Sequence, residues 1–185
     1  IELKDGSTIY LFKDGKMGDF ESNMGLKCEL YTKAALWDQG AVVCQRALKA
    51  NPKDVMSRYY LAEVQAVKVG PAERKKILEQ LGQQNPNHYT VQKALADLYY
   101  TEKNYVAATA KYRLVAALEP NDLSSILRLA QSEFQIKQYL PALEAYKKHC
   151  KNSRMVASEF KDATKQLRSD KNLHKFYDDA MQSCR

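Results

Sequence analysis

Histidine and cysteine are the residues of this chain best suited to catalysis or metal binding near neutral pH. The three histidines, His88, His149 and His174, are far apart in the sequence. His149 stands beside Cys150, but neighbours on a helix project about 100° apart, which is poor geometry for a base and its nucleophile. None of the patterns GxSxG, HExxH, GxGxxG or the P-loop occurs. We therefore expect neither an enzyme nor a bound cofactor.

The four cysteines are spaced too widely for a metal-binding knuckle. No CxxC occurs among Cys28, Cys44, Cys150 and Cys184. An even number of cysteines is compatible with an oxidising compartment. Two interpretations stay open: the cysteines form two disulfides, or all four are free thiols that serve as small core residues.

Length and composition favour a folded protein with one repeat array or one ordinary domain. The chain has 185 residues, of which 45% are apolar, and it carries a net charge of +7. No apolar run approaches the ~18 residues of a membrane span, and acidic residues separate the basic pairs, so we expect no membrane span and no nucleic-acid partner. The start at Ile1, without a methionine, suggests a processed or trimmed protein.

An internal repeat organises most of the chain. Asn51-Pro52, Asn85-Pro86 and Glu119-Pro120 are evenly spaced, at an interval of about 34 residues that is typical of a helical-hairpin repeat. In the same register, further positions match between segments: Leu61-Ala62 with Leu95-Ala96 and Leu129-Ala130, Trp37 with Tyr105 and Tyr139, Ala108 with Ala142, and Tyr112 with Tyr146. Small residues let two helices approach closely, and a proline ends each second helix. One helical hairpin cannot bury its apolar faces alone, whereas three or more stacked hairpins can.

This pattern resembles the tetratricopeptide repeat (TPR) family, most clearly at Leu95, Ala96, Tyr99, Tyr105, Ala108, Tyr112 and Pro120. The resemblance implies an all-α solenoid of about four helical hairpins, at 21–54, 55–88, 89–122 and 123–154, with C-terminal capping helices in 155–185. We expect the capping helices at 155–167 and 170–181, with Leu173, Phe176, Tyr177 and Ala180 facing inward.

Two of the repeats depart from the family pattern. In the second repeat, Gly70-Pro71 opens the second helix and Arg74 replaces the small residue, which suggests a splayed hairpin. In the first repeat, Lys27 takes an apolar position and Gly40 takes the small one.

In the TPR family the first helix of each hairpin lines a concave groove that binds partner proteins. Carried over in register, the groove positions are Met56, Tyr59, Glu63 and Ala66; Lys93, Asp97, Tyr100 and Thr101; and Ser124, Leu127, Gln131 and Phe134. The apolar members form a stripe able to grip a peptide or a partner helix, unless they pack against the next hairpin instead.

The same register places the cysteines on the repeats. Cys28 and Cys44 take positions that face each other across the first hairpin, so a disulfide between them is geometrically reasonable. Cys150 lies late in the fourth repeat and Cys184 follows the last capping helix, so a Cys150–Cys184 bond would hold that helix in place.

Residues 1–18 lack a helical period. They predict a β-hairpin about Asp5-Gly6, with a second turn at Asp14-Gly15. The stretch DGSTIYLFKDGKMG resembles the opening of periplasmic copper-binding proteins of the CopK type, which use methionine thioethers as soft ligands for copper(I). That resemblance implies a bacterial periplasmic or other extracytoplasmic location. It makes Met17 a weak candidate ligand, with apolar packing as the alternative.

Three functions follow as hypotheses. The first is a scaffold that binds a peptide or helix of another protein, in assembly of a bacterial envelope, pilus or secretion complex. The second is a periplasmic copper or soft-metal handling protein that uses the N-terminal segment. The third is a structural protein that forms homo-oligomers through the N-terminal hairpin or an exposed end of the array.

Overall fold

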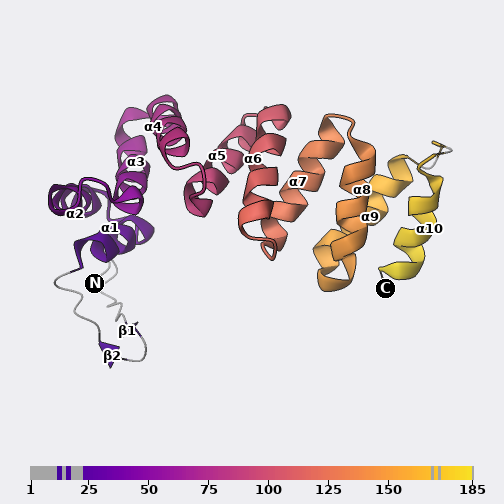
Figure 1. Cartoon of the computed structure of the whole chain (residues 1–185), viewed down its shortest axis with the longest axis horizontal. Helices are drawn as coiled ribbons and strands as arrows, with labels where there is room; N and C mark the ends of the chain where they lie inside the picture. The colour runs from indigo at the N-terminus through magenta and orange to yellow at the C-terminus, as the bar shows by residue number, and fades with distance from the viewer. Residues whose placement is uncertain (1–11, 14–15, 18–22, 168, 171, 185) are drawn as a thin grey trace. The chain divides into compact units, whose positions relative to one another are not determined.

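The computed structural model describes residues 12–13, 16–17, 23–167, 169–170 and 172–184, and nearly all of them are helical (Figure 1). The prediction of an all-helical repeat protein is confirmed. The chain divides into two compact units, residues 1–86 and 87–185, each described by itself below. None of the helices in the described residues is long and apolar enough to cross a membrane.

Among the described residues, the first unit contains two helical hairpins and the second contains two more with two terminal helices. The helices of the first unit are α1 (Met24–Lys33), α2 (Trp37–Ala50), α3 (Val55–Val69) and α4 (Pro71–Gln84). Those of the second are α5 (Tyr89–Thr101), α6 (Tyr105–Leu118), α7 (Leu123–Gln135), α8 (Tyr139–His149), the short 3-10 helix η1 (Cys150–Asn152), α9 (Arg154–Gln166) and α10 (His174–Ser183). The four hairpins fall within the predicted repeat intervals, whose boundaries as units stay a prediction.

Polar side chains cap the start of several helices. Asn23, Asp54, Asp122 and Ser153 each accept a hydrogen bond from a backbone N–H in the first turn of α1, α3, α7 and α9. Such caps satisfy N–H groups that have no partner within the helix. The starts of these helices can therefore be recognised in the sequence from a short polar residue.

The turns inside three of the hairpins share the same backbone conformation. Ala35, Lys103 and Lys137 all have positive φ, at 55°, 59° and 62°. The residue that follows each donates its N–H to a carbonyl five residues earlier, as Asn104 does to Tyr99 over 2.9 Å. This is the Schellman arrangement, which closes the C-terminal end of a helix. These three turns, spaced by one or two repeat lengths, give the hairpins the same geometry.

The second hairpin turns differently, at Gly70. Its φ of 90° and ψ of 173° place it where side chains are rarely tolerated, and it both ends α3 and precedes Pro71, the first residue of α4. Arg74 takes the position of the small residue, and its guanidinium reaches the Glu63 carboxylate of α3 with contacts of 2.8–3.0 Å. An ion pair thus replaces the close apolar contact that the other hairpins use.

Small and aromatic residues at the repeated positions form the core. Ala62, Ala96, Ala108, Ala130 and Ala142 are at most 1% exposed. In the second unit a larger apolar cluster joins α7 and α8 to the terminal helices through Tyr146, Phe160 and Phe176. The terminal helices therefore complete the core of this unit, as capping helices do.

The predicted β-hairpin about Asp5-Gly6 is not seen in the described residues, because that turn lies outside them. The structure describes only β1 (Phe12–Lys13) and β2 (Lys16–Met17), two short strands that pair antiparallel. They flank the second predicted turn, at Asp14-Gly15, which also lies outside the described residues.

The last helix begins later than predicted, at His174 and not at Asp170. The Asp170 carboxylate accepts the N–H of Asn172, and its carbonyl accepts that of His174, so these residues form a turn before the helix. Of the predicted inward residues, Phe176 is buried and Leu173 packs on the core. The side chains of Tyr177 and Ala180 lie outside the description.

Candidate functional site

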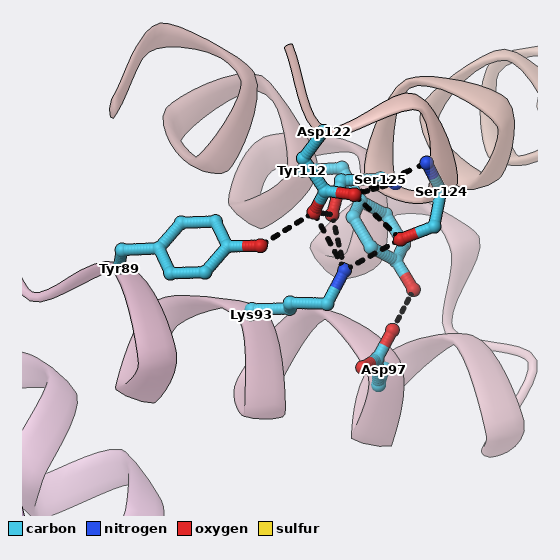
Figure 2. Close-up of polar contacts among 7 residues, drawn as sticks. All are labelled: Tyr89, Lys93, Asp97, Tyr112, Asp122, Ser124 and Ser125. Atoms are coloured by element: carbon cyan, nitrogen blue, oxygen red, sulfur yellow. Dashed lines mark hydrogen bonds and ion pairs between the residues drawn. The ribbon is translucent and has the colours of Figure 1, made fainter. Parts of the chain in front are cut away.

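A polar network joins α5 to the start of α7 (Figure 2). The Lys93 ammonium donates to Asp122 Oδ2 over 2.7 Å and to the hydroxyls of Ser124 and Ser125 over 2.8 and 2.7 Å. The Tyr89 hydroxyl donates to the same carboxylate over 2.6 Å. Asp122 also caps α7, so one carboxylate serves two helices.

These contacts change how the Asp122 carboxyl and its neighbour titrate. Burial alone would raise the pKa of Asp122, but the hydrogen bonds from Lys93, Ser124, Ser125 and Tyr89 outweigh it and hold that pKa well below its usual range. Burial and the bond to Asp122 raise the pKa of Tyr89 to about 12. The Lys93 charge is thereby matched by Asp122, which leaves Lys93 less able to attract an anion than the sequence alone indicates.

The first pocket of this unit lies on the face formed by α5, α7 and α9. We call it the central pocket; its volume is about 300 Å³, and its lining includes Lys93, Asp97, Leu127, Arg128, Gln131 and Met155. Asp97 is held there by the buried Tyr112, whose hydroxyl donates to Asp97 Oδ1 over 2.5 Å. Leu127 is only 5% exposed, so it belongs to the core as much as to the pocket.

The second pocket of about 190 Å³ adjoins the first. We call it the aromatic pocket; its lining includes Tyr100, Gln131, Phe134, Tyr146, Glu159 and Asp162. Two of its rings pack on neighbouring aromatic rings. Phe134 packs edge to face on Tyr139 at 5.0 Å, and Tyr100 does so on Tyr105 at 5.6 Å. Gln131 lines both pockets and accepts a hydrogen bond from the Tyr100 hydroxyl over 3.1 Å. The two pockets thus share Gln131 as a lining residue.

Seven of the predicted groove residues line these two pockets: Lys93, Asp97, Tyr100, Ser124, Leu127, Gln131 and Phe134. They come from α5 and α7, whose starts at Tyr89 and Leu123 are one repeat length apart. The sequence register therefore brings them together on one face, while their role in binding a partner stays a prediction.

Of the four groove residues predicted in the first unit, Met56, Tyr59 and Glu63 take part in its own packing. Met56 and Tyr59 pack against the apolar cluster around the buried Cys28, Cys44 and Tyr60. Glu63 is bound by Arg74 through both carboxylate oxygens. A pocket of about 220 Å³ in this unit is lined by other residues, among them Arg58, Ile77 and Leu81. We therefore place the candidate site in the second unit.

The sequence register did not predict that α9 contributes residues to the pockets. One full repeat after Leu123, the first residue of α7, falls at Ala157, whereas α9 begins earlier, at Arg154. The interval is shorter because η1 takes the place of the last part of the connection between α8 and α9. A search for the same face at this shorter spacing would have found the residues that α9 adds to the pockets, which are Met155, Glu159 and Asp162.

Both predicted disulfides are present in the structure. Cys28–Cys44 joins α1 to α2, with Cα atoms 4.6 Å apart, and Cys150–Cys184 joins η1 to the end of α10, with Cα atoms 5.4 Å apart. The alternative of four free thiols is wrong for this structure. Because Cys150 is bonded to Cys184, it is also unavailable as a nucleophile beside His149.

No group of three or more histidine, cysteine, aspartate or glutamate side chains able to hold a metal ion occurs in the part of the chain that the structure describes. The side chain of Met17 lies outside the described residues, so its suggested role as a copper ligand stays a prediction.

Comparisons with known proteins match this chain in two ways, one over its N-terminal part and one over most of its length. The family described as copper resistance protein K matches residues 1–36, so the likeness continues past Gly18, where we expected it to end, and includes α1. No curated protein matches the chain.

Solved structures of MamA, a TPR-like helical protein, match most of the chain. MamA MSR-1 has 17% sequence identity and a TM-score of 0.65, covering 86% of this chain and 93% of its own. MamA AMB-1 has 17% identity and a TM-score of 0.66, covering 86% and 88%. A double mutant of MamA RS-1 has 14% identity and a TM-score of 0.66, covering 90% and 96%. At these identities the likeness concerns the fold, and the chain has the TPR-like helical fold of MamA.

Proposed function

We propose that this protein is an interaction scaffold whose second unit binds a peptide or helix segment of another protein along α5, α7 and α9. The observation that carries the proposal is the pair of pockets that meet at Gln131. They offer apolar and aromatic surface beside amide, carboxylate and guanidinium groups, which is the mixture found in peptide-binding sites. TPR-like folds are of a non-enzymatic, protein-binding type, which agrees with this role.

The proposed location is extracytoplasmic, in the periplasm of a bacterium. Two disulfides support it, because such bonds persist in oxidising compartments. The match to copper resistance protein K, a periplasmic family, points the same way. In that location the partner would belong to an envelope, pilus or secretion assembly.

The test is a substitution at the point where the pockets meet. Gln131→Arg places a longer side chain across both pockets, while the helix itself is retained because arginine is a good helix former. We expect partner recovery, measured by mass spectrometry after affinity purification from the cells that produce the protein, to fall at least about tenfold, which corresponds to ~1.4 kcal/mol.

The matched control is Val106→Arg, which adds the same side chain at a position of α6 that is 68% exposed and lines neither pocket. Equal recovery of partners by the Gln131→Arg variant and the wild-type protein would contradict binding at this face. This test is sharper than removing Tyr100 or Phe134, because both rings also brace the helices.

A second candidate function is soft-metal handling by the N-terminal segment, supported by the family match over residues 1–36. Cys28 falls in that segment but is held in a disulfide, so the soft ligands left there are the thioethers of Met17 and Met24. Copper(I) titration against a competing chelator tests this: uptake should fall in a Met17→Ala variant, and uptake equal to that of the wild-type protein would remove the hypothesis.

A further inference from the structure

The aromatic pocket combines three rings with two carboxylates. Tyr146 is 3% exposed and forms part of the core, while Tyr100 and Phe134 are half-buried. Glu159 and Asp162 enter from α9. The faces of aromatic rings carry negative electrostatic potential, so rings and carboxylates together favour a positive charge.

Glu159 is the pocket carboxylate that has no partner among the described residues. It is half-buried, and in the described part of the chain it makes no ion pair or hydrogen bond. Its charge is close enough to Tyr146 to help burial raise the pKa of that hydroxyl. A half-buried carboxylate without a counter-charge is costly unless a ligand supplies one.

Asp162 is only weakly neutralised within the protein. Its partner is Lys165, three residues later on the same helix, at 3.3 Å, and both side chains are 63% exposed. Exposed pairs of this kind contribute little and exchange readily with solvent. Arg128 bonds to neither carboxylate among the described residues, but its guanidinium lies over the Tyr100 ring at 4.4 Å and its Nη1 contacts Gln131 at 3.5 Å, so Phe134 is the half-buried ring left to face a ligand's charge.

The size of the pocket limits what it can hold. Its volume of about 190 Å³ corresponds to roughly six water molecules at ~30 Å³ each, which is comparable to the volume of one side chain. Gln131, Gln135 and Gln166 in its lining supply amide groups that can bond to the main chain of a bound segment.

We propose that the aromatic pocket is a subsite for one cationic side chain, lysine or arginine, of the partner segment. The charge would contact Glu159 and Asp162, and its apolar stem would lie against Tyr100 and Phe134. This inference rests on the proposed function and adds to it the chemistry that the partner must present. Charge complementarity is what selects this occupant over an acidic or purely apolar one.

The experiment uses a displayed library of random peptides selected against the intact, disulfide-bonded protein. We expect the enriched peptides to share one lysine or arginine at a fixed position relative to an apolar residue. The same selection on a Glu159→Gln, Asp162→Asn variant should keep the apolar preference and lose the basic one, because these changes remove charge while keeping shape.

The matched control is Glu144→Gln, the same change at an exposed position of α8 outside the pocket lining. A selected peptide is then synthesised with its basic residue replaced by norleucine. On the wild-type protein and the Glu144→Gln control this replacement should weaken binding about tenfold, whereas on the double variant it should change binding less than about twofold.

The possible outcomes separate failure of the cationic subsite from failure of the proposed function. Enrichment without a basic residue, or a basic preference unchanged in the double variant, would overturn the cationic subsite alone and leave peptide binding intact. If no peptide is enriched on the wild-type protein beyond the Gln131→Arg variant, the proposed function fails and the subsite fails with it.

Discussion

At the scale of single residues, Asp122 connects two helices of the second unit. It caps α7 and receives hydrogen bonds from Lys93 and Tyr89 of α5. A charged group shared in this way is costly to remove, because its partners lose their bonds and the Lys93 charge is left half-buried. The geometry of the central pocket depends on it, since Lys93 is also a lining residue.

We predict that Asp122→Asn lowers the free energy of unfolding by about 2–3 kcal/mol at pH 7, measured by urea denaturation. The folded-state pKa of Asp122 is depressed, so its contribution is present above the unfolded-state value of about 4 and is lost as the pH falls below it. The difference between variant and wild-type protein should therefore shrink between about pH 4 and pH 2.

The control for this prediction is Asp162→Asn, whose carboxylate is 63% exposed and should contribute less than about 1 kcal/mol. An Asp122→Asn effect that stays constant across that pH range would show that the carboxylate charge is not what stabilises the junction of α5 and α7.

At the scale of helices and turns, Gly70 is the position least able to accept another residue. Its φ of 90° and ψ of 173° belong to a region that essentially only glycine occupies. We predict that both Gly70→Ala and Gly70→Asn destabilise the first unit by about 1–3 kcal/mol, measured by thermal unfolding. Asparagine is the informative variant, since it would be well tolerated in an ordinary left-handed turn.

The turns also show where prediction from the sequence ends. The repeat register was readable because small residues such as Ala96 and Ala130 must stand where helices approach closely. The positive φ of Lys103 and Lys137 was not readable, because glycine usually marks such turns and lysine does not. The hydrogen bonds of the hairpin impose that conformation in spite of the local preference.

The candidate site was also predictable only in part. Residues of α5 and α7 that share the register, such as Asp97 and Gln131, line the two neighbouring pockets. Glu159 was not foreseen, because η1 shortens the interval before α9 and moves every position on that helix out of register. The groove role predicted for the first-unit residues stays a prediction; there Glu63 pairs with Arg74, a long residue at a position where the repeat has a small one.

At the scale of the whole molecule, each unit has one disulfide. They join residues 16 and 34 positions apart, for which the chain-entropy model gives stabilisations of about 3 and about 4 kcal/mol. Trp37, the sole tryptophan of the chain, lies at the start of α2 and so reports on the first unit. The two bonds can therefore be examined separately.

We predict that Cys28→Ala, Cys44→Ala lowers the denaturation midpoint seen by Trp37 fluorescence, because the crosslink of the first hairpin is lost. Cys150→Ala, Cys184→Ala should leave that signal nearly unchanged and should lower the midpoint seen by circular dichroism, which reports on all helices. Stability in repeat proteins is largely local, which is the reason for this separation. Equal shifts of the tryptophan signal in both variants would contradict it.

The Cys150–Cys184 bond has one more consequence. It closes a covalent ring that contains all of α9 and α10 and, with them, Glu159 and Asp162 of the aromatic pocket. A protease that cuts the connection between α9 and α10 would therefore leave one molecule rather than two. The nick should become visible on a denaturing gel only after reduction, and the cleaved protein should keep its ligand-binding surface attached until the disulfide is broken.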